Sequence, residues 1–567
     1  MILERQLTAE ERGMGQTKEP QGSGRKGVES QDGMGSSSSS TLVGTPRSSS
    51  PKLSASANER TQLLSPPMNS ISTGKWPPTI GTLRAWLTYQ PRPIPIVNKI
   101  LPANAMSSTV IILISINIFY ALYRVPFTIP MLFVFADRSS LVFVANLPWL
   151  YLFAAKNQPI KLLTGYSYES LNILHRRLGE LMCLAALVHS LGMIGVWYTL
   201  LRPVGFSLAR FLLSKIILLG IGAFIAYESL YFTSLGSFRQ RWYELFLGLH
   251  IVLQVVALVS LFFHHHGSRV YVGIALAIFL IDRVVYRMTI KSVSFPAALV
   301  TYDDKKTVGV HLSVPLGKQP PLHKRLVGAG IGAGWKPTDH VFLTIPAISR
   351  KHIIQSHPFT IASRAPALKD DTAWLELLIR AQDGFSGDLL RYAEGHEKVN
   401  VRLDGPYGSQ HAIEMLQNSD ICVIVAGGSG IAVTWPAVCA IADPSRQGDK
   451  NPENDAYSQV PKRILFVWVV QKATHLSWLA RGKIAELRSR GVVVVVPAPT
   501  EEKGRPNIAA IIDEWITDND DGFCNGRGRV GVVCSGPDGM GRAVRNTCSA
   551  LQGRGRDVGV CIEKFGW

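Results

Sequence analysis

Two long apolar stretches of this chain each carry a pair of histidines that are fourteen residues apart. His175 and His189 lie in the first stretch, and His250 and His264 lie in the second. In an α-helix, fourteen residues rise about 21 Å and bring the two side chains to within about 40° of each other around the axis. Each helix therefore offers one histidine near either edge of a hydrocarbon layer about 30 Å thick.

The equal spacing on two helices favours a role for these histidines as haem ligands. Imidazole is an axial ligand of haem iron, and side chains on facing helices build cofactor sites inside bundles. One histidine in a membrane helix is more simply a hydrogen-bonded polar residue, but intramembrane ionisable groups that recur at a fixed spacing indicate function. His265 and His266 are alternative outer ligands, or a surface cluster that meets a metal substrate.

Six apolar segments predict a transmembrane domain over residues 105–290. They span residues 105–123, 139–155, 167–198, 206–234, 242–264 and 270–289. Basic residues follow the second, fourth and sixth segments, which places both termini in the cytosol by the positive-inside rule. Arg176 and Arg177 are candidates for pairing with the propionates of an inner haem and Arg269 with those of an outer haem, although a purely topogenic role explains them equally well.

Residues 1–80 are rich in Ser, Gly and Pro and predict a disordered cytosolic tail. Glu59, Leu63 and Leu64 within it have the spacing of an acidic dileucine sorting signal, which would direct the protein to a vacuole-like endomembrane. An inert tail on a plasma-membrane protein is the alternative. The net charge of +18 is spread over the flanks of apolar helices, so we expect no nucleic-acid partner. The seven cysteines form no CxxC pair, which argues against a structural zinc site.

The texture of the sequence changes from about residue 295. Short β-branched runs between Pro and Gly turns predict a small antiparallel barrel over residues 295–410. A buried apolar strand, a glycine turn and a helix follow, and further buried strands predict a parallel α/β nucleotide-binding domain over residues 418–567. The turn Gly427–Gly430 lies where a helix N-terminus can bind a pyrophosphate.

The sequence resembles the fungal ferric reductase family, a branch of the ferric reductase and NADPH oxidase superfamily, from about residue 105 to residue 567. The four spaced histidines and the motifs HPFT, DGPYG, GGSGIA, CSGP and FGW appear in that family's order. The resemblance implies a multidomain fold. A six-helix transmembrane haem bundle would be followed by an antiparallel β-barrel FAD domain and an α/β NADPH-binding domain of the ferredoxin-NADP reductase type.

The resemblance also implies roles for individual residues. Contacts to the isoalloxazine and ribityl groups of FAD would come from His357, Pro358, Phe359 and Thr360, and contacts to its pyrophosphate from Arg380 and Ser386. The NADPH pyrophosphate would be held by Gly427, Gly428, Ser429 and Gly430. The nicotinamide would lie beside Cys534, Ser535, Gly536 and Pro537.

For three positions the sequence allows a second interpretation or departs from the family's pattern. Cys534 is a catalytic candidate beside the nicotinamide, but it is more simply a buried small residue in a strand. Trp567, with Phe565, resembles the terminal aromatics that cover the flavin and must move aside for the nicotinamide. Gln471 stands where family members often have an arginine, so Lys472 and Arg505 are the candidates for binding a 2′-phosphate.

By this resemblance, we expect transfer of electrons from cytosolic NADPH through FAD and two b haems to ferric chelates, and also cupric ones, on the far side of the membrane. The protein would be an NADPH-dependent ferric-chelate reductase, with an iron permease or oxidase as a downstream partner. An NADPH oxidase that reduces dioxygen to superoxide shares every motif and is the alternative. The complete set of FAD and NADPH motifs disfavours a haem-containing membrane scaffold or sensor without turnover.

Overall fold

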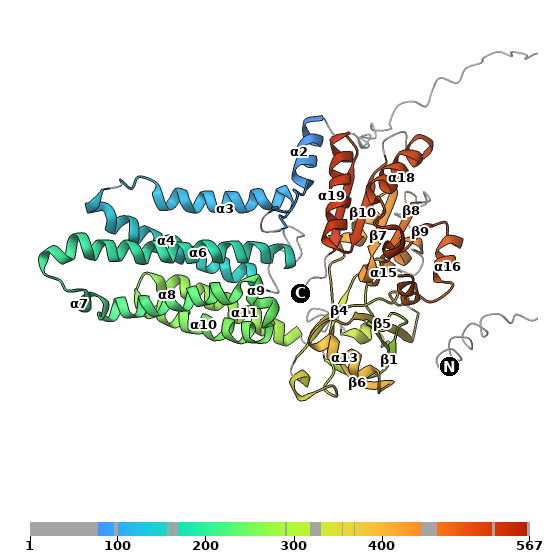
Figure 1. Ribbon diagram of the computed structural model, residues 1–567, viewed down its shortest axis with the longest axis horizontal. Helices are drawn as coiled ribbons and strands as arrows, with labels where there is room; N and C mark the ends of the chain where they lie inside the picture. The colour runs from blue at the N-terminus through green and yellow to red at the C-terminus, as the bar shows by residue number, and fades with distance from the viewer. Residues whose placement is uncertain are drawn as a thin grey trace, which may run out of the picture. The chain divides into compact units, whose positions relative to one another are not determined.

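A computed structural model describes residues 78–95, 100–126, 128–155, 160, 168–289, 292–317, 330–353, 355–367, 369–443, 462–523 and 528–563. All of them belong to one compact unit, Ser70–Trp567. In chain order they form a helical bundle, an antiparallel sheet and a parallel sheet with helices (Figure 1). The sorting motif at Glu59, Leu63 and Leu64 and the terminal aromatics Phe565 and Trp567 lie outside the described residues.

Long helices form each of the six predicted segments. They are α3 (Asn104–Leu122), α4 (Leu132–Ala154), α6 (Tyr168–Val196), α8 (Lys215–Ser234), α10 (Tyr243–His264) and α11 (Ser268–Thr289). Among the described residues, the first five are long and apolar enough to cross a membrane. Helix α11 falls short of that apolar character because it carries charged side chains, including the ion pair between Asp282 and Arg283 at 2.7 Å.

The bounds of three helices differ from the prediction. Helix α4 begins at Leu132 instead of residue 139, because Arg138 interrupts the apolar pattern but donates a hydrogen bond to the carbonyl oxygen of Tyr123 (2.6 Å). The third segment continues from α6 into a π-helical turn, Trp197–Leu201. The fourth segment is divided into α7 (Leu208–Leu212) and α8, with Ser214 at the break.

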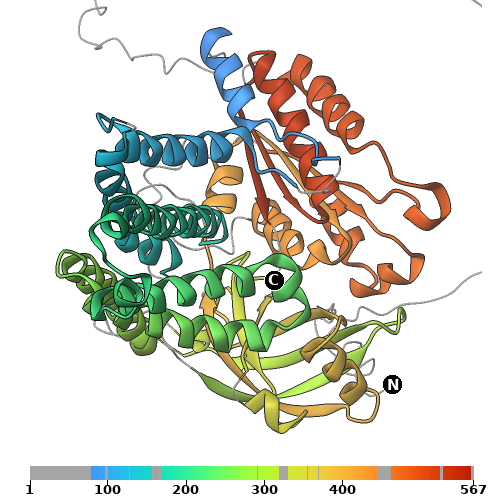
Figure 2. The same ribbon diagram turned by 60° about the vertical axis from the view of Figure 1, so that its left-hand side comes forward.

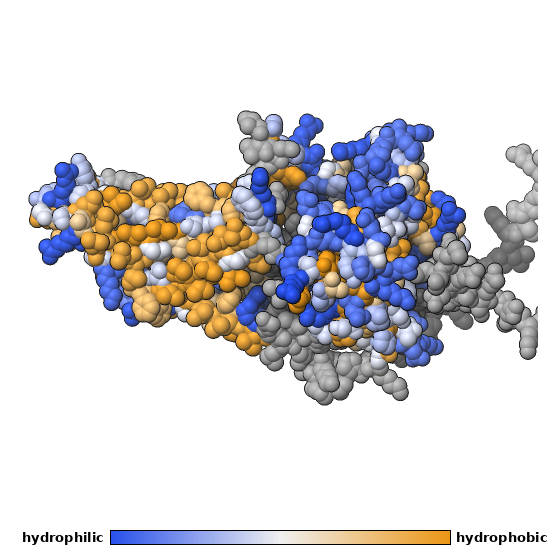
Figure 3. Space-filling view, turned by 60° about the horizontal axis from the view of Figure 1, so that its bottom comes forward, coloured by the Kyte–Doolittle hydropathy of each residue, from blue (hydrophilic) through white to orange (hydrophobic). Residues whose placement is uncertain are grey.

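The surface of the bundle is apolar over most of its area, whereas the surface of the two sheet domains is largely hydrophilic (Figure 3). In α3, for example, Ile111 is 62% exposed and Ile112 is 58% exposed. A contiguous apolar surface of this extent is not left in water. The chain is an integral membrane protein, and these side chains face lipid.

The domain that follows the bundle contains a six-stranded antiparallel sheet, as predicted. Its strands are β1 (Val293–Thr301), β2 (Thr307–Pro315), β3 (His340–Thr344), β4 (His357–Thr360), β5 (Thr372–Arg380) and β6 (Lys398–Tyr407), in the order β4-β3-β6-β1-β2-β5. The two edge strands approach each other where Ile361 bridges to Leu377 and the backbone N–H of Ala362 donates to Glu376 (2.8 Å). The sheet therefore curls into a barrel, and helix α13 (Phe385–Ala393) lies between β5 and β6 in the chain.

The C-terminal sheet is parallel and has five strands. They are β7 (Ile421–Gly427), β8 (Arg463–Val469), β9 (Val493–Val495), β10 (Val530–Ser535) and β11 (Val558–Glu563), in the order β11-β10-β7-β8-β9. Alternate residues of β7 pack into different cores: Cys422 and Ile424 face helices α14 (His411–Gln417) and α15 (Ile431–Ala442), and Val423 faces α18 (Ile508–Phe523) and α19 (Asp538–Gly553). The sheet thus has helices on both faces (Figure 2).

Candidate functional site

Each of the four predicted ligand histidines has its Nδ1 atom anchored by a neighbouring helix. The Nδ1 of His175 lies 3.0 Å from the carbonyl oxygen of Leu150, that of His189 lies 2.8 Å from Ala136, and that of His264 lies 2.7 Å from Ile216. A carbonyl oxygen only accepts hydrogen bonds, so in these three rings Nδ1 carries the proton and Nε2 keeps a free lone pair.

The fourth histidine has a different anchor. The Nδ1 of His250 lies 3.3 Å from the hydroxyl oxygen of Ser234, and this oxygen both donates and accepts. The hydrogen bond orients the ring without fixing its tautomer. A second partner that orients the imidazole and leaves the other nitrogen free is the usual support of a metal-bound histidine.

Two glycines allow the helices to approach closely enough for these hydrogen bonds. A Cβ atom on Gly220 of α8 would lie 2.6 Å from Cε1 of His264. A Cβ atom on Gly192 of α6 would lie 2.7 Å from the Cβ of Ala136, the residue whose carbonyl anchors His189. Both distances are shorter than carbon atoms tolerate without a shift, so any larger residue would displace the pair. Neither glycine was singled out from the sequence.

The histidines His189 and His264 lie opposite each other on α6 and α10. Their ring centroids are 6.5 Å apart with the ring planes at 77°. Metals bind imidazole nitrogen at about 2.0–2.1 Å, so a metal between two opposed rings separates their nitrogens by about 4 Å. The separation of the rings leaves this room.

The arrangement fits a haem iron better than an ion held by protein alone. Within the described residues, no group of three or more His, Cys, Asp or Glu is placed to hold a metal ion. Haem iron needs only two axial ligands from the protein. The alternative outer ligand, His265, is engaged elsewhere, because its Nδ1 accepts a hydrogen bond from the backbone N–H of Gly267 (3.2 Å).

Two of the three arginines predicted to pair with haem propionates have other contacts. Arg177 pairs with Glu180 at 2.5 Å, and Arg269 lies against the ring of Phe262 at 5.5 Å. The side chain of Arg176 is exposed. Arg176 is thus the best placed of the three for an added anion.

The motif HPFT forms strand β4, and two of its polar atoms are buried without a partner in the described structure. They are Nε2 of His357 and Oγ1 of Thr360. Buried polar atoms without partners carry a large desolvation penalty, which a bound ligand relieves. The ring of His357 stacks on Phe385 with 4.2 Å between centroids. The strand therefore presents hydrogen-bonding atoms beside aromatic surface, as a flavin ring system requires.

The start of α13 supplies the surroundings that a flavin pyrophosphate requires. Arg380 ends β5 with an exposed side chain, and Ser386 lies in the first turn of α13. The hydroxyl oxygen of Ser386 accepts a hydrogen bond from the backbone N–H of Gln382 (3.0 Å), which holds the connecting loop against the helix. A cation and a helix N-terminus together favour a phosphate.

The predicted glycine turn joins the end of β7 to α15 and packs against the turn that follows β10. A Cβ atom on Gly430 would lie 2.1 Å from the carbonyl oxygen of Ser535, and one on Gly427 would lie 2.7 Å from Pro537. Gly428 has φ +56, a conformation that glycine adopts without strain. Strands β7 and β10 are neighbours although they are first and fourth in the chain order of this sheet, so the two turns meet at the switch point where ligands of parallel sheets bind.

Cys534 and Ser535, the last two residues of β10, differ in their surroundings. Burial raises the pKa of the Cys534 thiol to about 12, so the sulfur stays protonated at neutral pH. This favours the interpretation of Cys534 as a buried small residue of β10. The hydroxyl oxygen of Ser535 is buried without a partner, and Gly536 approaches Gly427 so closely that a Cβ atom would lie 3.0 Å from its Cα.

The candidates for a 2′-phosphate follow β8 and β9, the two strands on the other side of β7 in the sheet. Lys472 lies 3.8 Å from a carboxylate oxygen of Glu501, and the amide of Gln471 donates to the same oxygen at 3.3 Å. Arg505 has an exposed side chain and stands in the loop before α18. Gln471, Lys472 and Arg505 thus lie at the same edge of the sheet as the glycine turn, beyond the carboxyl ends of the parallel strands.

Models of two known families match this chain. The model described as "Ferric reductase like transmembrane component" matches residues 139–261, and the model described as "FAD-binding domain" matches residues 330–411. The first range includes His175, His189 and His250, and the second includes strand β4 and helix α13.

Curated proteins similar to this chain are ferric reductases of fungi. "Ferric reductase transmembrane component 4" of Saccharomyces cerevisiae is 27% identical over 307 residues, which are 52% of this chain and 38% of that protein. "Probable cell surface ferric reductase kap2" of Aspergillus oryzae is 26% identical over 443 residues, which are 73% of this chain and 56% of that protein. The matched region thus spans roughly half of such relatives or less.

Solved structures give only distant likenesses. A flavohemoglobin from Malassezia yamatoensis with bound FAD and heme aligns with a TM-score of 0.35 and 12% identity, over 76% of this chain and 97% of that one. A ferredoxin-NADP+ reductase from Plasmodium falciparum aligns with a TM-score of 0.30 and 12% identity, over 48% of this chain and 96% of that one.

The half-buried position of His357 predicts a pH dependence of stability. Burial, and next the neighbouring His352, lower the pKa of His357 to about 4 in the folded protein, whereas an unfolded histidine titrates near 6.5. Between these values the unfolded state binds more protons, so stability falls as pH decreases from about 6.5 to about 4. The variant His357→Gln should flatten this dependence.

The measurement is the melting temperature of the purified chain in detergent at pH 7 and at pH 5. The melting temperature of wild type should fall more between pH 7 and pH 5 than that of His357→Gln. The variant His411→Gln, at an exposed histidine, should behave as wild type. If the melting temperature falls equally in wild type and in His357→Gln, the low pKa of His357 is not the cause of the pH dependence.

Proposed function

We propose that this chain, a member of the ferric reductase family by its transmembrane component and its FAD-binding domain, carries electrons from cytosolic NADPH across a membrane to ferric chelates. The observation that carries the proposal is the set of anchored histidines at matched positions in two membrane helices. Two haem sites stacked along these helices would let electrons pass from one face of the membrane to the other.

In this proposal the histidines hold two b haems. His175 and His250 would bind the inner haem, and His189 and His264 the outer one. The hydrogen bonds at Nδ1 support the role, because they leave Nε2 free to bind a metal and would strengthen the imidazole as a ligand. Arg176 would pair with a propionate of the inner haem.

The barrel would bind FAD along strand β4 and the start of α13. His357 and Thr360 would bond to the flavin ring system through their unpartnered polar atoms, while Pro358 and Phe359 shape its surface. Arg380 and Ser386 would receive the pyrophosphate. When bound, FAD accepts a hydride and releases electrons one at a time, and haem iron accepts them singly.

The parallel domain would bind NADPH at the meeting point of the two turns. Gly427, Gly428, Ser429 and Gly430 would hold the pyrophosphate through backbone N–H groups. Gly536 and Pro537, with Cys534 and Ser535 at the end of β10, would border the nicotinamide. Arg505 and Lys472 would bind the 2′-phosphate, and Trp567 would cover the flavin until the nicotinamide displaces it.

The proposal also includes the electron acceptor and the membrane in which the protein resides. A ferric chelate, or a cupric one, would be reduced beside the outer haem, near His265 and His266, and an iron permease or oxidase would use the product. Both termini would be cytosolic. The membrane would be the plasma membrane, or a vacuole-like endomembrane if Leu63 and Leu64 act as a sorting signal.

Reconstituted vesicles test the direction of transfer. The purified chain is inserted into liposomes that contain a ferric chelate with a ferrous indicator, and NADPH is added outside. We expect ferrous ion to form inside in wild type. His189→Ala should lose this signal but keep the bleaching of its bound flavin by NADPH.

The same vesicles separate the competing functions. Superoxide formation at the expense of ferrous ion would contradict the proposal and favour an NADPH oxidase. No flavin reduction by either NADPH or NADH would contradict both and favour a protein without turnover.

The close approach of Gly220 to His264 gives a second prediction. In Gly220→Ala the added methyl group meets Cε1 at 2.6 Å, so His264 must move and the outer haem should be lost or weakly held. Gly222→Ala is a matched control on the same helix, because its methyl group meets Ser260 at an ordinary 3.5 Å.

Haem content from the reduced-minus-oxidised absorption spectrum is the readout. Gly220→Ala should retain about half of the haem of wild type, and Gly222→Ala should retain all of it. Full haem content in Gly220→Ala would show that His264 is not held against α8 as a ligand.

A further inference from the structure

The chain passes from the barrel to the parallel domain between Tyr407, the end of β6, and His411, the start of α14. Side chains of the two domains also meet across this boundary. Tyr302 and Leu378 of the barrel pack against a core cluster of the parallel domain. Apolar contact is non-directional, so it does not select one orientation. The polar contacts at the same boundary are therefore the ones that specify register.

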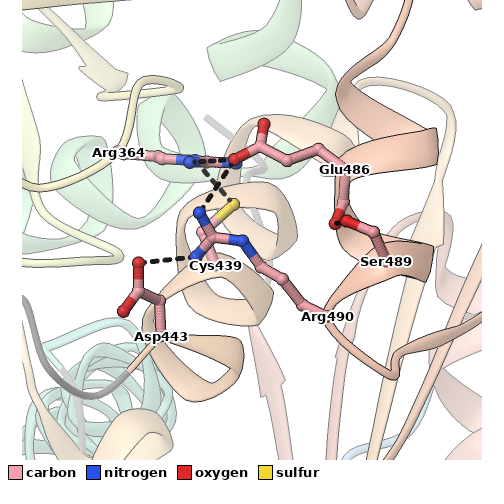
Figure 4. A network of polar contacts seen from close by, with 6 residues as sticks. All are labelled: Arg364, Cys439, Asp443, Glu486, Ser489 and Arg490. Atoms are coloured by element: carbon pink, nitrogen blue, oxygen red, sulfur yellow. Dashed lines mark hydrogen bonds and ion pairs between the residues drawn. The ribbon is translucent and has the colours of Figure 1, made fainter. Parts of the chain in front are cut away.

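Arg364 of the barrel makes the most specific of these contacts (Figure 4). It stands four residues after Thr360, the last residue of β4. Its Nε–H donates to the sulfur of Cys439 on α15 at 3.1 Å, and its Nη1 donates to Glu486 on α16 (Lys483–Ser489) at 2.9 Å. Its guanidinium group also lies 5.6 Å from the ring centroid of Trp435.

In a second ion pair across the boundary, the barrel supplies the anion and the parallel domain supplies the cation. Lys483 of α16 lies 3.7 Å from Glu376 of β5, and its Nζ lies 5.9 Å from the ring centroid of Trp435. Trp435 is 2% exposed, so a buried indole has a cation of each domain near its ring. In the two pairs around Trp435 each domain supplies one cation and one anion, so a displaced register brings like charges together.

The acceptor Glu486 is itself held in place. Arg490 donates to the same oxygen at 3.0 Å and binds Asp443, at the end of α15, at 2.5 Å (Figure 4). The hydrogen bond from Arg364 is the main cause that keeps the pKa of Glu486 below its usual range, so its carboxylate stays charged at neutral pH.

The elements joined here are those that carry the proposed cofactor sites. Helix α15 begins directly after the turn Gly427–Gly430, and strand β4 contains His357–Thr360. A rotation at the boundary therefore moves the dinucleotide turn relative to the flavin strand. Ion pairs between partly exposed side chains contribute little to stability, so their value here is geometric.

We propose that Arg364, Glu376, Lys483 and Glu486, arranged around Trp435, form an interdomain clamp that aligns the nicotinamide of NADPH with the flavin ring for hydride transfer. This inference rests on the proposed function. The clamp residues are positioning residues: the two electrons and the proton of the hydride move from nicotinamide to flavin, and no clamp atom forms or breaks a bond.

The geometry predicts which kinetic quantity responds. The dinucleotide turn and the flavin strand are intact when the clamp is broken, so both ligands still bind. Hydride transfer itself depends on the alignment of the reacting atoms, and a displacement of about 1 Å lowers such a rate by up to about 100-fold. The rate of flavin reduction should fall, while the half-saturating NADPH concentration changes little.

The test uses the full-length chain loaded with FAD and mixed with NADPH without oxygen in a stopped-flow instrument. Arg364→Gln and Glu486→Gln should each slow flavin reduction about 10- to 100-fold and enlarge the isotope effect of NADPH deuterated at the transferred hydrogen. The double variant should be no slower than the slower single variant, because both changes break one pair. Arg364→Lys should recover part of the rate.

Arg554→Gln is the matched control. Arg554 pairs with Asp513 at 2.8 Å, and both residues lie within the parallel domain on the side of α18 and α19. This variant should reduce flavin at the wild-type rate. All variants should keep the FAD content and melting temperature of wild type.

Two results would overturn the clamp while leaving the proposed function standing. One is flavin reduction within twofold of wild type in Arg364→Gln and Glu486→Gln. The other is a slow rate that is fully explained by lost FAD or a lower melting temperature, with no change in isotope effect. If neither NADPH nor NADH reduces the flavin of the wild-type chain, the proposed function itself fails.

Discussion

The hydrogen bond between an imidazole Nδ1 and a carbonyl oxygen of the next helix is the interaction on which the bundle depends. It satisfies one polar atom of a ring that lies among apolar helices, and it leaves Nε2 with a free lone pair. For His189 and His264 the bond forms only because Gly192 and Gly220 allow close approach of the neighbouring helices. The site and the helix packing are therefore specified by the same small residues.

In the parallel domain, too, glycines allow two segments to approach closely. Gly430 and Gly427 bring the turn after β7 against the turn after β10, where any side chain would collide with Ser535 or Pro537. This contact places backbone N–H groups of both turns at the switch point of the sheet. The barrel contributes strand β4 and the start of α13. Arg364 links the barrel to α15, the helix that follows the glycine turn, through Cys439, and to α16 through Glu486.

The sequence predicted features that depend on periodicity, and it missed those that depend on packing. The fourteen-residue spacing indicated the four histidines, and the alternation and glycine turns indicated both sheets. Helix α4 began earlier than predicted because Arg138 has a carbonyl acceptor that no pattern reveals. The choice between His264 and His265 could not be made from the sequence, because it depends on Gly220 of another helix. The partners of Arg364 are 75 and 122 residues away along the chain, which is why the clamp has no local signature.

We propose above that the anchored histidines hold two haems with both axial positions filled by imidazole. The most direct measurement is the haem content and spin state of the purified wild-type chain, from quantitative absorption spectroscopy and electron paramagnetic resonance of the oxidised protein. We expect two haems per chain, both low-spin with two histidine ligands. A single haem, or a high-spin signal from iron with an open axial position, would contradict it.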